Sequence, residues 1–257
     1  MSGRAVILAG GKGSRLAPYT TVLPKPLLPV GDRAILDVVV RQLQQAGFDH
    51  LTIAVGYLSH LVKAVMGDGS RFGVAIDYRE EEAPLGTVGP LATIEGLDDS
   101  FLVMNGDVLT ALDYADLMRI HREAGNLLTI ASHRRVVRTE YGVLHLGDQA
   151  GETSRVVAFE EKPQLPYTVS MGVYIMEPRV LDFLEVGKRF DLPDLVLKLI
   201  DLDEPVGSYL FDGFWLDIGR HDDYERAIQE YDEVKGQLLR EREREPSISA
   251  GGEPGGK

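Results

Sequence analysis

Residues 5–16 read AVILAGGKGSRL, which joins a continuous apolar run to a glycine-rich loop. Five consecutive apolar residues that end at Gly10-Gly11 predict a buried strand followed by a tight turn. The glycines let the backbone approach a ligand closely and point several N–H groups at one anion, and a plain turn is the alternative. The stretch therefore predicts the first strand of a sheet, with a candidate anion-binding loop at its carboxyl end.

Two common nucleotide-binding motifs do not fit this loop. A dinucleotide fingerprint that starts at Gly11 needs glycine or alanine where Leu16 stands. A P-loop ends in Gly-Lys-Ser or Gly-Lys-Thr, whereas Gly13-Ser14-Arg15 occupies that place. A generic dinucleotide oxidoreductase and a P-loop enzyme are therefore both disfavoured.

A proline-flanked lysine follows the loop. Residues 23–31 read LPKPLLPVG, and Lys25 stands ten positions after Arg15. Proline on either side of Lys25 restricts the backbone, which predicts an extended segment that limits where the ammonium group points. The alternative is a proline-rich connector that carries a solvated lysine.

The rest of the first half alternates strand and helix patterns. Further strands are expected at 51–55, 74–78 and 101–104, with helices at 35–46, 58–65 and 87–95. This order predicts parallel β-α-β units in a sheet covered on both faces.

The second half is less regular. It predicts a helix at 113–124, a strand at 127–133, short β segments at 143–145, 155–159 and 169–176, and helices at 180–184, 195–200 and 222–239. Clustered short strands favour a lid or a substrate-facing subregion on the same sheet. No linker is evident, so one compound domain is expected over 1–239, followed by a disordered charged and Gly/Pro-rich tail at 240–257.

Composition narrows the function classes. The chain has 257 residues, 44% of them hydrophobic, and 40 acidic against 27 basic residues give a formal net charge of −13. This balance disfavours nucleic acid and anionic membranes as partners. The absence of cysteine excludes disulfides, thiolate zinc sites and cysteine nucleophiles. Without a long apolar run or a signal-peptide core, we expect a cytoplasmic protein.

Five motifs in one order resemble the signature of the sugar-1-phosphate nucleotidylyltransferases, also called nucleotide-sugar pyrophosphorylases. They are the glycine loop with its proline–lysine segment at 10–29, Pro84-Leu85-Gly86-Thr87-Val88-Gly89, Asn105-Gly106-Asp107, Glu160-Glu161-Lys162-Pro163, and Trp215-Leu216-Asp217-Ile218-Gly219. The resemblance extends to about Ala227. It implies a Rossmann-like three-layer α/β/α fold, the nucleotide-diphospho-sugar transferase fold, with a mixed, mostly parallel sheet and a smaller β-rich subregion facing the substrate.

The resemblance also implies a reaction. A sugar-1-phosphate oxygen attacks the α-phosphorus of a nucleoside triphosphate, and pyrophosphate leaves. Both reactants are anions, so an acidic chain must concentrate positive charge where they meet. The family pattern assigns that task to Arg15, Lys25 and Lys162, and it implies Mg²⁺ held by Asp107 and Asp217. For both aspartates the alternative is an ordinary turn residue.

Binding residues follow from the same resemblance. Residues 1–125 are expected to bind mainly the nucleotide, through Leu8, Gly10, Gly11, Gly13, Pro84, Gly86 and Thr87. Residues 126–239 are expected to bind mainly the sugar phosphate, and the substrate contacts are assigned to Asn105, Tyr141, Gly142, Glu161, Ser170 and Gly172. Gly142 and Gly172 are alternatively strand bulges, and Glu161 a surface salt-bridge partner.

The nature of the substrates is less constrained. The 84–89 motif is closest in pattern to guanylyltransferases acting on mannose- or heptose-1-phosphate. The alternatives are a thymidylyl-, uridylyl- or cytidylyltransferase acting on glucose-1-phosphate or another sugar-1-phosphate, and a regulatory relative that binds a nucleotide sugar without turnover. A cytidylyltransferase acting on a sugar acid or a cofactor precursor is a further alternative, which the intact Pro-Lys-Pro segment disfavours. Family members are commonly dimers or tetramers, so the resemblance also implies a homo-oligomer.

Overall fold

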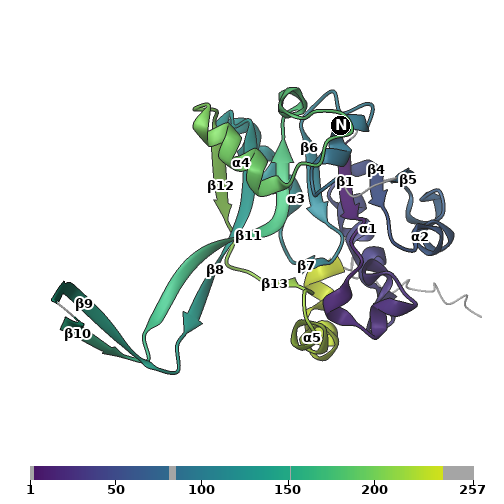
Figure 1. Ribbon diagram of the computed structural model, residues 1–257. Coiled ribbons are helices and arrows are strands. Elements are labelled where there is room, and N and C mark those ends of the chain that lie inside the picture. The colour runs from purple at the N-terminus through teal and green to yellow at the C-terminus, as the bar shows by residue number, and fades with distance from the viewer. Residues whose placement is uncertain (1–2, 81–84, 151, 240–257) are drawn as a thin grey trace, which may run out of the picture.

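A computed structural model describes residues 3–80, 85–150 and 152–239, and the expected tail at 240–257 lies outside them. The main sheet of the described chain has seven strands in the order β12-β8-β11-β6-β1-β4-β5. These strands are β1 (Gly3–Ala9), β4 (Phe48–Val55), β5 (Ala75–Glu80), β6 (Phe101–Asn105), β8 (Leu128–Arg138), β11 (Gln164–Met176) and β12 (Val206–Leu210). The strand predicted from residues 5–9 is therefore an inner strand of the sheet (Figure 1).

The strand order creates a crevice beside β1. The chain passes from β1 to β4 and β5 on one side and then returns to β6 on the other, and these four strands are parallel. Only β11 runs against its neighbours in this sheet of the described chain. In open α/β sheets, ligands bind beyond the carboxyl ends of strands where the order reverses. That point lies between β1 and β6.

Two apolar cores cover the two faces of the sheet. Alternate residues of β1 divide between them, since Ala5, Ile7 and Ala9 belong to the larger core and Val6 to the smaller one. Helices α1 (Ile35–Gln45), α2 (Ser59–Met66), α3 (Tyr114–Ala124) and α5 (His221–Leu239) contribute to the larger core, and α4 (Leu192–Asp201) contributes to the smaller. This confirms the three-layer α/β/α architecture.

Two predicted helices are 3₁₀ helices instead. The pattern at 87–95 corresponds to η5 (Gly89–Thr93), and that at 180–184 to η6 (Pro178–Phe183). Each carries a proline in its first two positions, where no N–H is needed, and each ends after six residues or fewer. The segment around Lys25 was predicted to be extended, and this prediction is wrong. Lys25–Leu27 form the 3₁₀ turn η3, in which Leu27 N–H donates to the Pro24 carbonyl over 2.8 Å.

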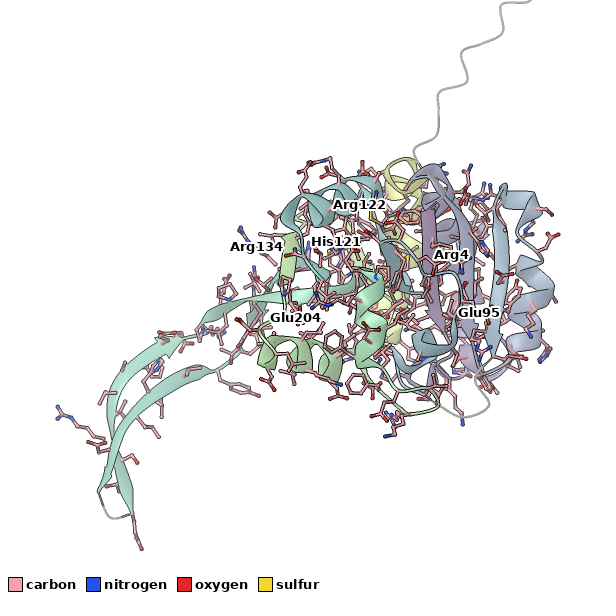
Figure 2. The ribbon with its side chains drawn as sticks, turned by 90° about the horizontal axis from the view of Figure 1, so that it is seen from above. Arg4, Glu95, His121, Arg122, Arg134 and Glu204 are labelled. Carbon is pink, nitrogen blue, oxygen red and sulfur yellow. The ribbon has the colours of Figure 1, made fainter. Side chains whose placement is uncertain are left out.

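An arm extends from one side of the body. Strands β8 and β11 pair beyond the sheet, and β9 (Gly142–Ala150) and β10 (Thr153–Glu161) form a separate two-stranded hairpin at its far end (Figure 1). We define the arm as residues 134–169. Figure 2 shows it from above, with Arg134 labelled where it meets the body. The sequence predicted the β segments but not that two of them continue as strands of 11 and 13 residues.

Four small elements complete the body. They are the paired strands β2 (Pro29–Val30) and β3 (Arg33–Ala34), and the paired strands β7 (Val108–Thr110) and β13 (Trp215–Asp217). The second pair matters most, because it brings the segment that ends at Asp217 alongside the segment that follows Asp107. No helix in the described part of the chain is long and apolar enough to cross a membrane.

Candidate active site

The glycine-rich loop leaves β1 and closes on itself. Gly13 has a φ of +62° and precedes the 3₁₀ turn η1 (Ser14–Leu16), and the Thr20 hydroxyl donates to the Gly13 carbonyl over 2.8 Å. A Cβ at Gly13 would lie 2.9 Å from the Thr20 side chain, so only glycine fits this position. Leu16 anchors the turn in the core, while Arg15 is exposed at the loop surface.

Lys25 begins η3, the 3₁₀ turn that comes after the glycine-rich loop, and its side chain points inward. Its side chain is 10% exposed, and its ammonium group forms an ion pair with Oδ2 of Asp107. A buried ammonium is costly unless it is paired, so this contact fixes where the positive charge lies. The proline-flanked segment therefore carries an oriented lysine rather than the solvated one of the alternative interpretation.

Asp107 stands at the crevice between β1 and β6. Gly106 N–H donates to the Leu8 carbonyl over 2.9 Å, which ties the end of β6 to β1. Ile218 N–H donates to the Asp107 carbonyl over 3.1 Å, which brings the end of β13 to the same place. Oδ1 of Asp107 is buried and accepts no hydrogen bond from any described residue. One carboxylate oxygen is thus unsatisfied at the centre of the site.

The electrostatics of Asp217 show that it belongs to the same group. Desolvation in the recess raises the pKa of its carboxyl, and the negative charges of Asp107 and Asp223 raise this pKa further, whereas Lys25 and Arg15 lower it. The Arg15 guanidinium lies beside Gly219, where a Cβ would be 3.7 Å from Nη1. The structure therefore brings Arg15, Lys25, Asp107 and Asp217 together, as the sequence predicted.

Two cavities flank this group. One of about 250 Å³ lies over the glycine-rich loop and is lined by Leu8, Ala9, Gly11, Gly13, Ser14, Arg15, Lys25, Pro26, Gly106 and Asp107. The other, of about 320 Å³, lies on the side of Asp217 and is bordered by the base of the arm, β13 and α5. Arg15, Lys25 and Asp107 line the first cavity and Asp217 lines the second, so each cavity contains part of the charged group.

The second cavity has a cationic, aromatic wall. The His133 ring lies 5.2 Å from the Trp215 ring, and the Arg135 guanidinium lies 5.7 Å from it. Trp215 Nε1–H donates to the Met171 carbonyl over 3.0 Å, which fixes the indole. Arg135 has no ion-pair partner in the described chain and is exposed to the cavity. Arg135 and His133 were not predicted as site residues, and the only sequence signal for them is the run His133-Arg134-Arg135.

Ser170, Gly172 and Asn105 lie at a bulge of β11 beside this wall. The β8–β11 register shifts between Ser170 and Tyr174, and Gly172 has a φ of +75°. A Cβ at Gly172 would lie 2.7 Å from Nδ2 of Asn105, so the two residues are in close contact. These three candidates are in the body of the site, and the bulge that was the alternative for Gly172 is also present. Their contacts with substrate remain a prediction.

The other sugar-phosphate candidates lie on the arm. Tyr141 is 79% exposed, and Gly142, Glu161 and Lys162 are exposed near the hairpin, with Lys162 at a φ of +46°. A Cβ at Gly142 would lie 2.4 Å from the Phe159 ring, so this position packs on the hairpin itself. No described contact joins these four residues to Asp107 or Asp217, and their predicted roles depend on where the arm lies when substrate binds.

The segment expected to face the nucleobase packs on the start of α4. Thr87 N–H donates to Oδ1 of Asp191 over 3.0 Å, and Leu192 N–H donates to the Thr87 hydroxyl over 2.7 Å. Gly86 contacts the same turn, where its Cβ would lie 2.5 Å from the Phe190 carbonyl oxygen. Pro84 lies outside the described residues. Thr87 therefore has a structural role as an α4 cap, and its nucleotide contact stays a prediction.

The carboxylates fit a divalent cation that also binds substrate. Within the described ranges, no group of three or more His, Asp or Glu side chains is arranged to hold a metal. Magnesium commonly takes one or two carboxylates and completes its shell with water and substrate phosphates. The unsatisfied Oδ1 of Asp107 and the neighbouring carboxylate of Asp217 are donors of this kind. Asp107 and Asp217 are therefore chemically suited to Mg²⁺.

Comparison with known proteins shows which family and which relatives this chain is similar to. The family profile described as "Nucleotidyl transferase" matches residues 4–234. A UTP–glucose-1-phosphate uridylyltransferase from Synechocystis sp. is 34% identical over 246 residues, which cover 88% of this chain and 62% of that protein. A mannose-1-phosphate guanylyltransferase from Mycobacterium tuberculosis is 35% identical over 229 residues, which cover 87% and 63%. The chain thus spans less than two thirds of the length of these curated relatives.

Solved structures show the same fold. The structure of HddC from Yersinia pseudotuberculosis superposes with a TM-score of 0.68 and 22% identity, and the match covers 89% of this chain and 99% of that one. A UDP-glucose pyrophosphorylase complexed with UDP-glucose gives a TM-score of 0.64 at 18% identity, covering 91% and 99%. At these identities the likeness concerns the architecture alone.

Proposed function

This chain belongs to the nucleotidyl transferase family, and on that premise we propose that it transfers a nucleotidyl group from a nucleoside triphosphate to a sugar-1-phosphate. The products are a nucleoside diphosphate sugar and pyrophosphate. The observation that carries the proposal is the convergence of Arg15, Lys25, Asp107 and Asp217 between two cavities. The two curated relatives described above, named for this kind of reaction, also support it.

The reaction needs no nucleophile from the protein. An oxygen of the sugar phosphate, already ionised at neutral pH, forms a bond to the α-phosphorus. The bond from that phosphorus to the bridging oxygen of the β-phosphate breaks, and pyrophosphate takes the electron pair. Catalysis then consists of positioning the two anions in line and stabilising the charge that develops.

Each charged residue has a place in this scheme. Arg15, at the rim of the loop cavity, binds the departing phosphates through its planar fork of donors. Lys25 lies deeper and opposes the charge at the α-phosphate. Asp107 and Asp217 would hold Mg²⁺, which supplies charge neutralisation to the phosphate oxygens when it is bound. Lys162 would hold the sugar phosphate when the arm brings it to the site.

The proposed substrates are GTP with mannose-1-phosphate or heptose-1-phosphate. The pattern at 84–89 and the mannose-1-phosphate guanylyltransferase relative support this choice. A uridylyltransferase acting on glucose-1-phosphate is the alternative, supported by the relative from Synechocystis. Thymidylyl and cytidylyl transfer are the remaining options.

A pyrophosphate-release panel tests the proposal. The folded protein is incubated with each of GTP, UTP, dTTP, CTP and ATP against mannose-, heptose- and glucose-1-phosphate, with Mg²⁺ or with EDTA. We expect release only in the presence of Mg²⁺, and the largest kcat/KM with GTP and mannose- or heptose-1-phosphate. Release that is largest with UTP and glucose-1-phosphate would replace the proposed substrates and leave the reaction class intact. No release in any combination would favour a relative that binds a nucleotide sugar without turnover.

A further inference from the structure

The segment after the glycine-rich loop carries an exposed tyrosine to which the proposed reaction assigns no role. Tyr19 lies in η2 (Tyr19–Thr21), a short 3₁₀ turn between the loop and Lys25. Its neighbour Thr20 is buried and donates its hydroxyl hydrogen bond to Gly13, whereas Tyr19 is 50% exposed. Thr20 therefore closes the loop from within, and Tyr19 contacts a different element.

Tyr19 packs on the first turn of α5, which lies beside the loop in Figure 1. Its ring centroid lies 5.7 Å from that of His221 and 5.5 Å from that of Tyr224, with the ring planes at 52° and 65°. Aromatic rings attract one another in tilted and edge-on arrangements at these separations. Residues three apart lie on the same face of a helix, so His221 and Tyr224 form one surface for the Tyr19 ring. We call these three residues the aromatic clamp.

The α5 side of the clamp is fixed by hydrogen bonds. Tyr224 is 5% exposed, and its hydroxyl donates to the Pro29 carbonyl over 2.8 Å. Arg220 N–H donates to Oδ2 of Asp223 over 3.0 Å, and Tyr224 N–H donates to the Arg220 carbonyl over 3.0 Å. The half-exposed Tyr19 ring adds little to the buried core by comparison. Its contacts instead decide where the loop lies relative to α5.

Arg15 lies on the loop that the clamp holds. It is exposed, and no ion pair in the described ranges fixes its guanidinium group. A Cβ at Gly219 would lie 3.7 Å from Nη1 of Arg15 and 3.7 Å from Oδ2 of Asp223. Gly219 stands between Asp217 and His221 in the sequence. The loop and the segment that follows β13 therefore meet twice, once at Arg15 and once at the clamp.

We propose that Tyr19 is a positioning residue, which holds Arg15 at the loop cavity through its contacts with His221 and Tyr224. Tyr19 stands four positions after Arg15, so a loop that moves away from α5 carries the guanidinium group with it. Placing a charged group before substrate binds reduces the entropy lost on binding, and only the ligand that this group contacts benefits. The clamp itself does not depend on the reaction, whereas its effect on triphosphate binding rests on the proposed function.

Hydrogen exchange tests the clamp without any substrate. Backbone hydrogen bonds close η1 and η2, so exchange in a peptide over residues 10–24 reports whether the loop stays in place. We expect Tyr19→Ala to speed this exchange by about tenfold, because two ring contacts are lost. Tyr19→Phe keeps the ring and should leave the exchange unchanged. Val22→Ala is the matched control, since Val22 lies next to the same turn and is 70% exposed.

Steady-state kinetics tests the positioning role. We expect Tyr19→Ala to raise KM for the preferred triphosphate, and KM for pyrophosphate in the reverse reaction, by about tenfold. KM for the sugar-1-phosphate and the far-UV circular dichroism spectrum should be unchanged, and Tyr19→Phe should behave as the wild type. His221→Ala should reproduce the effect from the α5 side. His221→Phe should restore wild-type behaviour, since the clamp needs a ring and not a titratable group.

The results that would overturn the proposal are distinct from a failure of the proposed function. Unchanged exchange in Tyr19→Ala would show that the clamp does not hold the loop. Faster exchange with an unchanged KM for the triphosphate, or with equal increases in KM for both substrates, would exclude the positioning role. The same holds if Tyr19→Phe behaves like Tyr19→Ala, because the hydroxyl group would then act instead of the ring.

A wild-type chain without turnover would refute the proposed function and not the clamp. The exchange measurement and a calorimetric titration with GTP and Mg²⁺ then decide. We expect Tyr19→Ala to weaken the binding of GTP by about tenfold in Kd relative to the wild type and to Tyr19→Phe. An equal Kd in all three proteins would overturn the proposal.

Discussion

Lys25 is a nearly buried cation whose partner, Asp107, comes from 82 residues later in the chain. Removing either partner alone leaves the other charge without compensation, which typically costs about 3–5 kcal/mol for a buried pair. A loss of activity in a single variant would therefore mix misfolding with chemistry. The pair therefore has to be tested with a double variant that leaves neither charge unpaired.

The double variant Lys25→Met with Asp107→Asn separates the two effects. Replacing a buried ion pair by neutral groups of similar size is often without cost to stability, so we expect a thermal midpoint close to that of the wild type. We expect kcat/KM for pyrophosphate release to fall by at least about 10²-fold, because the charge stabilisation at the α-phosphate is lost. Scanning calorimetry and the release assay check this. A well-folded double variant with more than a tenth of wild-type activity would contradict the assigned roles.

We expect Asp217 to control the acid side of the pH profile. Desolvation and the charges of Asp107 and Asp223 raise its pKa, so its carboxylate takes up a proton at a higher pH than an ordinary aspartate does. Protonation would remove a proposed metal ligand, and activity should therefore fall as the pH drops through this raised pKa. Asp223→Asn removes one of the charges that raise the pKa, so we expect the acid limb of kcat/KM to move to lower pH. An unchanged limb, or one moved to higher pH, would show that another group controls it.

Arg135 is a cation that the structure adds to the site. It lies over Trp215 at the wall of the second cavity without an ion-pair partner in the described ranges. If it binds the sugar phosphate, Arg135→Ala should raise KM for the sugar-1-phosphate by about tenfold or more, with little change in KM for the triphosphate. Arg138→Ala, further along the arm, is the control. Equal effects of the two substitutions on KM would exclude a specific role for Arg135.

At the scale of elements, the helices and strands that depend only on residues close in sequence were the easiest to predict. The apolar run of β1 and the helical periods of α1 and α3 each depend on a few adjacent residues, and the structure confirms them. Asp107 was assigned by motif, and the structure places it beyond the carboxyl end of β6, beside β1. The 3₁₀ turns η3 and η5 did not follow, since short proline-containing segments fit several conformations.

The bulge in β11 holds Gly172 against Asn105, a residue that we propose to contact substrate. Gly172→Ala introduces a side chain at a φ of +75° and a contact of 2.7 Å with Asn105. We expect it to lower the free energy of unfolding by about 1–3 kcal/mol and to reduce activity through a displaced Asn105. Gly125→Ala is a matched control, since Gly125 has a φ of +63° and its Cβ would meet nothing within 4 Å. It should cost backbone strain alone and leave activity unchanged; reduced activity in this control would remove the argument from Asn105.

At the scale of the whole molecule, the long-range arrangement exceeds what one sequence can predict. Trp215 and Arg135 meet across 80 positions through the packing of β13 against the base of the arm, and no local pattern signals that contact. The arm itself was visible only as short β segments, because alternation in a strand does not reveal whether the strand lies in a sheet or projects from it. Lys162 and Glu161 were assigned by motif, and their place relative to Asp107 depends on the position of the whole arm.

We propose that one triphosphate binds among four side chains from distant parts of the chain: Arg15, Lys25, Asp107 and Asp217. A crystal structure with Mg²⁺ and a triphosphate analogue that cannot be cleaved at the α–β bridge would show whether it does. We expect the α-phosphate beside Lys25, the β- and γ-phosphates on Arg15, and the metal between Asp107, Asp217 and the phosphate oxygens. A triphosphate bound outside the cavity over the glycine-rich loop, with Asp107 and Asp217 contacting neither metal nor phosphate, would contradict it.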